Sequence, residues 1–370
     1  MYKLVSECEG TRARTGELRT AHGKVETPFF MPVSTIGSVK HISPTDLKDI
    51  GFEATISNAM LLDLKPGSDF IKKRGGLHKF TGFDRTVFAD SGGFQMIRSE
   101  LFESINDRGI YFRSPYDGKK IFVSPEIVMR VNMALGSDVV MTLDHMPDVL
   151  GPKTEIAEGV RRTRLWAERC KKMHDQLTEK KQLLFGICQG GIDTELRKKS
   201  ARHINELDFD GVAIGGLGIG ETKKDCYHAV DTAIPIFDKS KPRYLMGIGD
   251  PPDILEAVAH GADCSDSIFP TKNGRHGHVF TRSGFIKLSR GGYKEDDRPI
   301  DSSCDCFVCK NHSRAFLHHL IRIESKTVLR LMSYHNLHFL NNLMKDIRLS
   351  INEDRFVKFK KEFLKGYLKK

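Results

Sequence analysis

Eight short apolar runs, each followed by a stretch of helical character, constrain the fold more than any other feature of this chain. Each run ends in Gly, Asp, Asn or Pro, and several are nearly continuous in apolar residues, as in parallel strands buried on both faces. Eight such units within about 250 residues predict a (β/α)8 TIM barrel, an α/β fold. A doubly wound open sheet is the alternative, but no GxGxxG motif follows the first run. The runs span residues 27–35, 53–60, 85–93, 137–144, 182–191, 210–218, 242–250 and 263–271.

Helical stretches fill the gaps between these runs. Ser124, Pro125 and Glu126 combine a helix N-cap with Pro at the first helical position. One segment breaks the alternation, since residues 109–125 predict a β-hairpin that turns at Asp117-Gly118, inserted after the third strand. We expect helices at residues 43–50, 126–135, 154–177, 193–207, 223–237, 252–261, 313–332 and 337–347.

The length of the chain indicates more than one structural unit. Its 370 residues exceed the usual size of a single core, so we expect a small satellite beside one large domain. We assign residues 1–290 to a catalytic barrel with an N-terminal extension and the hairpin insertion. Residues 291–345 are the predicted zinc-binding subdomain, and residues 346–370 a basic C-terminal helix that packs on the barrel.

Three cysteines within six residues, Cys304, Cys306 and Cys309, form a dense group of metal-binding side chains. Thiolates this close can surround a Zn2+ ion tetrahedrally, at roughly 2.3 Å per Zn–S bond. Exposed reduced thiols and a redox pair are alternatives, and both fit the CxCxxC spacing less well. A Cys3His set leaves no open coordination position, so the ion would be structural. The spacing leaves four candidates for the histidine: His312, His318, His319 and His335.

Composition bounds the compartment and the partner. The other five cysteines, at positions 8, 170, 188, 226 and 264, are scattered singly, as in a cytoplasmic protein without disulfides. The N-terminus has no apolar signal segment and no stretch approaches eighteen apolar residues, so we expect no membrane association. Lys and Arg outnumber Asp and Glu by 58 to 48, and the net charge of +10 points to a polyanionic partner.

Polar residues stand at the carboxyl ends of the predicted strands, where a (β/α)8 barrel carries its active site. Each acid alone is more often a helix N-cap, and each Gly pair a turn. Convergence of three carboxylates on one rim is harder to explain as capping, because like charges held close raise each other's pKa. These strand ends carry Asp90 with Ser91-Gly92-Gly93, Asp144, Gln189 with Gly190-Gly191, Gly215-Gly216-Leu217, Met246-Gly247 and Asp266.

Carboxylates, a carboxamide and glycine-exposed backbone suit a flat, hydrogen-bonding heterocycle better than a phosphate. Asp and Gln side chains can bond to the amide edge of a purine-like base. Phe94 and Met246 are candidate covers for the faces of the ring, and core packing is the alternative for each. The strand ends therefore predict a site for a purine-like base.

Six motifs follow one another along the chain: FADSGGFQ (88–95), ICQGG (187–191), IGGLGIGE (214–221), YLMGIGDPPD (244–253), DSIFPTKNGRHGHVFT (266–281) and CxCxxC with a later YHN. Together they resemble the bacterial type of the tRNA-guanine transglycosylase family, in the family's order, from about residue 10 to 360. The resemblance implies a pentosyltransferase of queuosine biosynthesis. Such an enzyme replaces guanine at the wobble position of tRNAs with GUN anticodons by a 7-deazaguanine.

The resemblance also implies residue roles and a homodimer. Asp266 would be the nucleophile that attacks ribose C1′ and forms a covalent tRNA–enzyme intermediate, and Asp90 the general acid/base. His335 would be the fourth zinc ligand. The residues implied to bind the base are Asp90, Ser91, Gly92, Gly93, Phe94, Asp144, Gln189, Gly216, Leu217 and Met246. Those implied to contact RNA are Gly247, Ile248, Gly249, Asp250, Pro251, Pro252 and Asp253, and Thr271, Lys272, Asn273, Gly274 and Arg275 in a loop after the last strand.

Two positions depart from the family pattern. His145 and Met146 follow Asp144 where bacterial members usually carry an acidic residue and a cysteine, and Ile219 is bulky, as in users of preQ1. The overall pattern favours preQ1 over queuine as the incoming base. A non-catalytic tRNA-binding paralogue and a zinc-dependent hydrolase are the competing classes. Retention of both Asp90 and Asp266 argues against the first, and the closed ligand set against the second.

Overall fold

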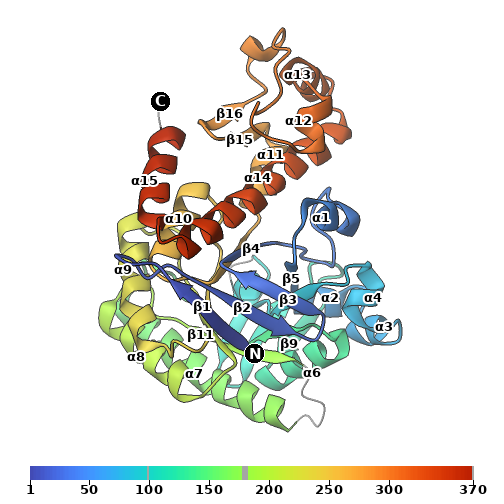
Figure 1. Cartoon of the computed structure of the whole chain (residues 1–370). Helices are drawn as coiled ribbons and strands as arrows, with labels where there is room; N and C mark the ends of the chain where they lie inside the picture. The colour runs from blue at the N-terminus through green and yellow to red at the C-terminus, as the bar shows by residue number, and fades with distance from the viewer. Residues whose placement is uncertain (98–99, 177–181, 369–370) are drawn as a thin grey trace.

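Eight parallel strands form a closed barrel at the centre of the chain (Figure 1). The structure is a computed structural model and describes residues 1–97, 100–176 and 182–368. The strands pair in the order β4-β14-β13-β12-β11-β10-β6-β5, and a bridge between Val33 and Ile56 joins the two ends. The predicted (β/α)8 barrel is confirmed. Its strands are β4 (Phe29–Pro32), β5 (Ala54–Asn58), β6 (Thr86–Asp90), β10 (Val139–Met141), β11 (Leu183–Cys188), β12 (Gly211–Ile214), β13 (Arg243–Leu245) and β14 (Cys264–Ser267).

Each strand lies within one of the predicted apolar runs, with one difference at the last. The sequence predicts a strand through residue 271, whereas β14 ends at Ser267 and helix α11 (Phe269–Arg275) follows. Pro270 lies in the first turn of α11, where its missing N–H costs no hydrogen bond, while it could not donate to a strand ladder. The segment expected as a loop after the nucleophile strand is therefore helical.

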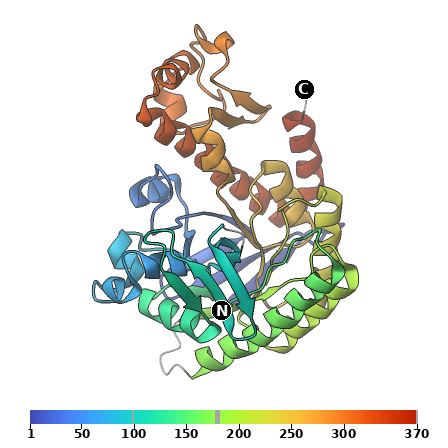
Figure 2. The ribbon, with the colours of Figure 1, turned by 180° about the vertical axis from the view of Figure 1, so that it is seen from behind.

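Helices cover the outside of the barrel, as the two opposite views show (Figures 1 and 2). Ser124 caps the helix that begins at Pro125, as predicted, and its hydroxyl accepts from the Ile127 N–H at 3.4 Å. The end of the predicted helix 154–177 lies outside the described residues. The predicted helices correspond to α1 (Pro44–Ile50), α6 (Pro125–Leu135), α7 (Lys153–Asp175), α8 (Thr194–Glu206), α9 (Lys223–Ala233) with the 3-10 turn η1 (Ile234–Ile236), and α10 (Pro251–Ala259). Four further short helices are α2 (Ala59–Leu64), α3 (Ser68–Lys72), α4 (Gly76–Thr81) and α5 (Gly93–Ile97).

Aromatic side chains fill the interior of the barrel. Phe88 on β6 meets Phe29, Phe185 and Tyr244 edge-on, with ring centroids 5.7 to 6.1 Å apart. A second and larger apolar layer lies between the strands and the helices and contains the fully buried Trp166. The filled interior closes the barrel below its mouth, so polar chemistry is confined to the strand ends.

An antiparallel sheet of β1 (Tyr2–Glu7), β2 (Arg14–Thr20) and β3 (Gly23–Thr27) covers the amino-terminal end of the barrel. Arg14 forms a fully buried ion pair with Asp263, the residue before β14, at 2.6 Å. At the turn between β2 and β3, His22 Nδ1 bonds to Asp138, the residue before β10, at 2.8 Å. Buried carboxylates at the strand starts thus hold this sheet in place.

The hairpin insertion after β6 is confirmed as strands β8 (Gly109–Arg113) and β9 (Lys120–Val123), which pair in antiparallel fashion. A third strand, β7 (Phe102–Asn106), pairs with β8 and was not predicted. The sheet packs beside α5, which follows the Asp90 strand. The insertion therefore borders one side of the barrel mouth.

The C-terminal part extends away from the barrel and returns to it (Figure 1). Helix α14 runs from this part to the barrel as one 27-residue element and crosses residue 345, where a domain boundary was predicted. The division into domains stays a prediction. The predicted helices 313–332 and 337–347 are instead divided near Glu324. The elements are β15 (His278–Thr281), β16 (Gly284–Lys287), the 3-10 turn η2 (Gly291–Tyr293), α12 (Phe307–Asn311), α13 (Arg314–Arg322), α14 (Lys326–Asn352) and α15 (Phe356–Tyr367).

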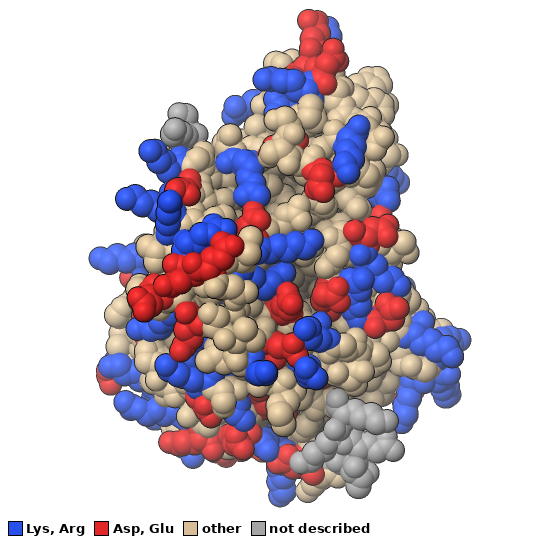
Figure 3. All heavy atoms as spheres, in the orientation of Figure 1, with Lys and Arg blue, Asp and Glu red and all other residues tan. Residues whose placement is uncertain are grey.

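Charged side chains of both signs are interspersed over the face shown in Figure 3, so the excess of Lys and Arg is spread out there. Among the described helices, none combines the length and apolar character that crossing a bilayer requires.

Candidate functional site

The carboxyl ends of the strands bring three carboxylates together at the barrel mouth. Asp90 ends β6, Asp144 lies three residues after β10, and Asp266 lies in β14. The negative charges of Asp144 and Asp266 both act on Asp90, which places the three groups in one electrostatic site. Three negative charges this close repel one another and lower the stability of the fold, unless some of the carboxyl groups are protonated.

Two donors hold the Asp266 carboxylate. The Tyr244 hydroxyl donates to Oδ1 at 2.6 Å, and the Gly247 N–H donates to the same oxygen at 2.9 Å. Desolvation raises the pKa of Asp266, and these two hydrogen bonds oppose the rise. Because the Tyr244 pKa lies well above its usual value, the phenol stays a donor. No hydrogen bond from another described residue reaches the second oxygen, Oδ2.

Asp90 has a pKa suited to proton transfer in both directions. Desolvation raises its pKa to about 7, and the charges of Asp144 and Asp266 contribute to the rise. The Gly92 N–H donates to Asp90 Oδ2 at 3.3 Å. A carboxyl group that titrates near neutral pH can serve as acid in one step and as base in the next.

Asp144 and Gln189 form a second polar pair, deeper in the mouth. Gln189 Nε2 donates to Asp144 Oδ2 at 2.6 Å, and both side chains are buried. Desolvation raises the pKa of Asp144 to about 6. Gln189 Oε1 is buried with no hydrogen-bond partner in the described structure. An unpaired buried acceptor beside a carboxylate matches a ligand that presents N–H groups.

Gly216 allows close approach to this pair. Its φ is +70°, and a Cβ there would lie 2.3 Å from Gln189 Oε1. The fully buried Arg197 on α8 supports the neighbouring loops, because its guanidinium donates to the carbonyl oxygens of Gly191, Cys188 and Gly215. The backbone around the Asp144–Gln189 pair is therefore fixed from behind.

The remaining base-binding candidates surround this centre. Ser91 is buried and accepts from the Gly93 N–H at 3.4 Å, and Leu217 is also buried. Phe94 is 42% exposed at the start of α5, so its ring is available as a cover rather than committed to the core. Met246 packs against the interior barrel core and follows β13.

The four predicted metal ligands also come together. One donor atom from each of Cys304, Cys306, Cys309 and His335 lies within 4.8 Å of the others. His335 Nδ1 is 3.3 to 3.8 Å from the three sulfur atoms. Zn–S and Zn–N bonds of roughly 2.3 and 2.1 Å at tetrahedral angles put S and N about 3.6 Å apart. The donor set therefore fits a tetrahedral metal ion.

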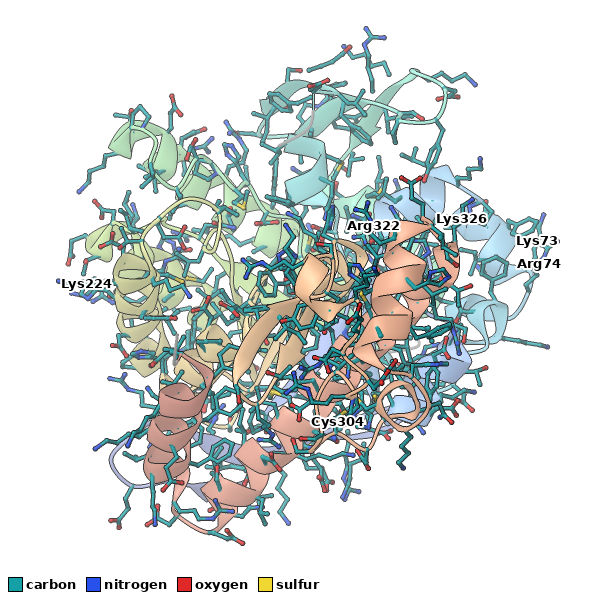
Figure 4. The ribbon with its side chains drawn as sticks, turned by 90° about the horizontal axis from the view of Figure 1, so that it is seen from above. Lys73, Arg74, Lys224, Cys304, Arg322 and Lys326 are labelled. Atoms are coloured by element: carbon teal, nitrogen blue, oxygen red, sulfur yellow. The ribbon has the colours of Figure 1, made fainter. Side chains whose placement is uncertain are left out.

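The second ring nitrogen of His335 explains why Nδ1 is free for a metal. His335 Nε2 lies 2.7 Å from the Phe280 carbonyl oxygen, to which it donates, so Nδ1 carries the lone pair. His318 bonds to the Leu288 carbonyl at 2.7 Å, and His312 stacks on Phe316. In Figure 4, Cys304 lies in the C-terminal part of the chain, in the loop before α12. This separates the metal cluster from the carboxylates.

Comparison with known proteins identifies the family. The family model described as queuine tRNA-ribosyltransferase matches residues 8–369. The chain belongs to this family. A queuine tRNA-ribosyltransferase of Bacillus subtilis is 44% identical over 366 residues, which are 99% of this chain and 96% of that protein. One from Fusobacterium nucleatum is 46% identical over 370 residues, 99% and 98% of the two chains, and one from Halothermothrix orenii 43% over 369 residues, 100% and 98%.

The queuine tRNA-ribosyltransferase family is the one that the sequence motifs predicted, so the predicted family and enzyme class are confirmed. The match and the described structure cover the same elements, from β2 to α15. Membership places the chain among tRNA-guanine transglycosylases of queuosine biosynthesis. A Cys3His cluster that could bind a metal ion is part of this family member's fold.

The departures from the family pattern have structural surroundings in this tRNA-ribosyltransferase. Arg162 Nη1 lies 2.9 Å from His145 Nδ1, and desolvation with this charge lowers the pKa of His145 to about 4. The imidazole is therefore neutral where an acid is usual. Met146 is buried, and its Cγ lies 3.4 Å from a Cβ built at Gly216. Met146 therefore forms a wall beside the Gly216 backbone.

The segments implied to contact RNA in the family flank the mouth, and their residues differ in accessibility. Thr271 and Gly274 are buried, and Gly274 packs against the backbone of α14, where a Cβ would lie 2.8 Å from the Ser333 nitrogen. Lys272 is exposed and Arg275 partly so. In the other segment Ile248 is buried, Gly247 holds Asp266, and Asp253 bonds to Lys223 at 2.7 Å. The exposed part of α11 is thus the basic part.

Sequence reasoning missed several residues of this family member, two at the mouth and one at the metal cluster. Tyr244 lies on β13, two residues before Met246, and donates to Asp266. Because side chains alternate along a strand, Tyr244 and Met246 point to the same side, which was the available signal. Asn58 ends β5 and donates to Gln95 Oε1 at 3.0 Å, beside Gly92. His338 Nδ1 is 3.7 Å from Cys304, and its i, i+3 spacing from His335 was the available signal.

Proposed function

We propose that the chain exchanges guanine at the wobble position of tRNAs with GUN anticodons (Asp, Asn, His and Tyr) for a 7-deazaguanine, by double displacement through a covalent intermediate on Asp266. One observation carries the proposal: Asp266 Oδ1 accepts from Tyr244 and Gly247, no other described residue donates to Oδ2, and Asp90 lies on the same rim. The names of the relatives agree with this activity.

In the first displacement, an Asp266 oxygen attacks ribose C1′ as the C1′–N9 bond to guanine breaks. Asp90 in its protonated form gives its proton to the departing base, so guanine leaves neutral. The C1′ centre passes through an oxocarbenium-like state, for which a carboxylate is a suitable nucleophile. The hydrogen bonds from Tyr244 and Gly247 keep the attacking group aimed during this step.

In the second displacement, Asp90 is ionised and removes the N9 proton of the incoming base. N9 attacks C1′ on the face that guanine left, and the ester bond to Asp266 breaks. Each step inverts C1′, so the pair retains the configuration that a nucleoside in tRNA requires. A pKa of about 7 lets Asp90 take both roles at neutral pH.

Base recognition is assigned to Asp144, Gln189 and the Gly216 backbone. An ionised Asp144 accepts N–H groups from the amide edge of guanine, and the unpaired Gln189 Oε1 accepts another. Phe94 and Met246 cover the faces of the ring, with Ser91, Gly92, Gly93 and Leu217 around its edge. We favour preQ1 over queuine as the incoming base, because Met146 is buried beside Gly216 and Ile219 is bulky, as in users of preQ1.

The anticodon loop is proposed to contact residues 247–253 and 271–275. The exposed Lys272 and the partly exposed Arg275 suit phosphates beside the exchanged nucleotide, which must be unstacked to enter the mouth. We further propose that the protein is a cytoplasmic homodimer. Its domain boundaries are proposed to follow residues 290 and 345.

Zinc is the proposed ion for Cys304, Cys306, Cys309 and His335, since three thiolates and an imidazole in a tetrahedral set select it. When bound, it would supply a structural crosslink and no catalytic water. The Phe280 carbonyl oxygen accepts from His335 Nε2 and so fixes the tautomer in which Nδ1 faces the ion site.

Incorporation of labelled guanine into tRNA tests the proposal. Asp266→Ala should abolish exchange and the denaturant-resistant tRNA adduct while keeping the melting temperature of the parent protein. Asp297→Ala, an exposed acid of the C-terminal part, is the matched control and should keep full exchange. Exchange by Asp266→Ala would remove the nucleophile assignment. Absence of exchange in the unaltered protein would favour the non-catalytic paralogue.

A further inference from the structure

A further histidine, His338, lies beside the metal cluster without being one of its four proposed ligands. It follows His335 by three residues on α14, so the two side chains lie on one face of the helix. His338 Nδ1 is 3.7 Å from Cys304 Sγ. The spacing within the cluster is the same, since His335 Nδ1 lies 3.3 to 3.8 Å from the three sulfur atoms. His338 therefore lies at ligand spacing from one member of the set.

Two neighbours place the lone pair of the His338 ring on Nδ1. Asn342 Nδ2, an amide nitrogen that can only donate, lies 3.4 Å from Nδ1. On the other side of the ring, Nε2 lies 3.4 Å from the Asp305 carboxylate, which can only accept when ionised. The tautomer with a proton on Nε2 and none on Nδ1 satisfies both contacts. His335 has the same tautomer, because its Nε2 donates to the Phe280 carbonyl oxygen.

This tautomer decides what the contact between His338 and Cys304 can be. A thiolate and an unprotonated ring nitrogen both offer electron pairs, so no hydrogen bond can join them. A metal ion accepts electron pairs from both, and the neutral imidazole is a common metal ligand. The His338 side chain is only 13% exposed, so water has little access to Nδ1. The ring is therefore oriented as a metal ligand and not as a hydrogen-bond donor to the cluster.

Cys304 is the ligand that His338 can replace. In the described part of the chain, His338 forms a sulfur contact with Cys304 and with neither Cys306 nor Cys309. Cys304 is also partly exposed, whereas Cys306 is buried. The additional histidine thus lies next to a thiolate that solvent can reach.

We propose that His338 is a reserve ligand of the metal cluster, which takes the place of Cys304 on the ion. Cys304 Sγ leaves with its electron pair as a thiolate, and the Nδ1 lone pair of His338 forms the new bond without loss of a proton. A Cys3His set becomes a Cys2His2 set, and both are tetrahedral zinc sets. The inference rests on the proposed zinc site and is independent of the exchange chemistry.

The zinc content of full-length variants after dialysis against a chelator tests the proposal. Cys304→Ala, which leaves no donor atom at position 304, should keep one zinc per chain. Cys304→Ala/His338→Ala should lose the metal. Cys306→Ala should lose it too, since His338 makes no contact with that sulfur in the described structure. Cobalt-substituted Cys304→Ala should keep tetrahedral absorption with a weaker thiolate-to-metal band, because two thiolates remain in place of three.

Cys304→Ala/His319→Ala is the matched control, because His319 is exposed on α13 and belongs to no described metal-binding group. It should keep zinc. A variant without metal can unfold, so the melting temperature is also measured with added Zn2+, which should raise it for Cys304→Ala and not for Cys304→Ala/His338→Ala. Loss of zinc from Cys304→Ala, or its retention by Cys304→Ala/His338→Ala, overturns the reserve role alone. Absence of zinc from the unaltered protein overturns the proposed zinc site with it.

Discussion

The Tyr244 hydroxyl donates a 2.6 Å hydrogen bond to the Asp266 carboxylate, from one barrel strand to its neighbour. The two side chains start from β13 and β14, whose pairing fixes their separation before any substrate arrives. Tyr244 is buried in the interior core, so the donor cannot swing away. The Asp266 carboxylate, the proposed nucleophile, is thus oriented by the barrel strands themselves.

Tyr244→Phe should slow guanine release in single turnover by roughly 10- to 100-fold, since a hydrogen bond to a charged group contributes about 1.5–3 kcal/mol. Loss of the donor also raises the pKa of Asp266 further, so the acid limb of the rate profile should move to higher pH. Tyr2→Phe, which removes a hydroxyl bonded to Asp263 at the opposite end of the barrel, is the control. An unchanged rate and profile would contradict the orienting role.

The two half-reactions should respond to pH in opposite directions around 7. Release of guanine requires protonated Asp90 and should slow as pH rises through its pKa of about 7. Attack by the incoming base on the isolated adduct requires ionised Asp90 and should slow as pH falls through the same value. Rapid-quench measurement of each half-reaction checks this, and Asp90→Asn should flatten both profiles. Parallel pH dependence of the two steps would refute a shared group.

Removal of the metal should destabilise the C-terminal part and leave the chemistry of the carboxylates unaltered. We expect one zinc per chain by elemental analysis, and its loss in Cys306→Ser with a lower melting temperature. Cys226→Ser, a buried cysteine of α9, should keep the metal. Cobalt substitution should give thiolate-to-metal absorption in the parent protein. Full zinc content in Cys306→Ser would contradict the ligand set.

The Asp138 carboxylate at the amino-terminal end should make stability depend on acid pH. It is fully buried, and desolvation raises its pKa, but bonds from His78, Val87 and His22 outweigh this and hold the pKa below its usual value. A depressed native pKa adds stability above the unfolded value near 3.9, which is lost as pH falls through the native pKa.

His78→Ala should therefore cost about 1–3 kcal/mol of unfolding free energy near neutral pH and move acid unfolding to higher pH. Urea titration at several pH values measures both effects. Lys79→Ala, the exposed neighbour on α4, should change neither. Equal acid stability of His78→Ala and the parent would show that the bond to Asp138 contributes nothing.

The residues at the strand ends could be predicted from sequence, because parallel barrel strands place all their carboxyl ends on one rim. Asp90, Asp144 and Gln189 could be placed on one rim from their positions after apolar runs alone. Tyr244 was not found because it lies inside β13, where an apolar-looking run hides the direction of a single side chain. Asn58 was not found because, as the last residue of β5, it lies within the predicted run 53–60 and not after it. Their roles depend on strand register, which the sequence does not state.

Other elements escaped prediction for local reasons. The N-terminal sheet alternates charged residues with few apolar ones, and its stability comes from distant partners such as Asp263 and Asp138. Helices α2 to α4 are interrupted by Pro66, Gly67, Gly75 and Gly76, so no helical period is sustained. Helix α11 contains Pro270 and Gly274, yet packing against α14 overrides their low propensity.

His335 and Asn336 are consecutive on α14 but serve different parts of the molecule. Asn336 donates to the carbonyl oxygens of Pro270, in the first turn of α11, and of His278, at the start of β15, both at 3.0 Å, while His335 faces the three cysteines. Successive residues of a helix point about 100° apart, so turning α14 about its axis moves both contacts by one angle. An ion held by His335 would therefore fix the rotation of α14 about its axis. Through Asn336 it would also fix the position of α11, the helix that follows Asp266.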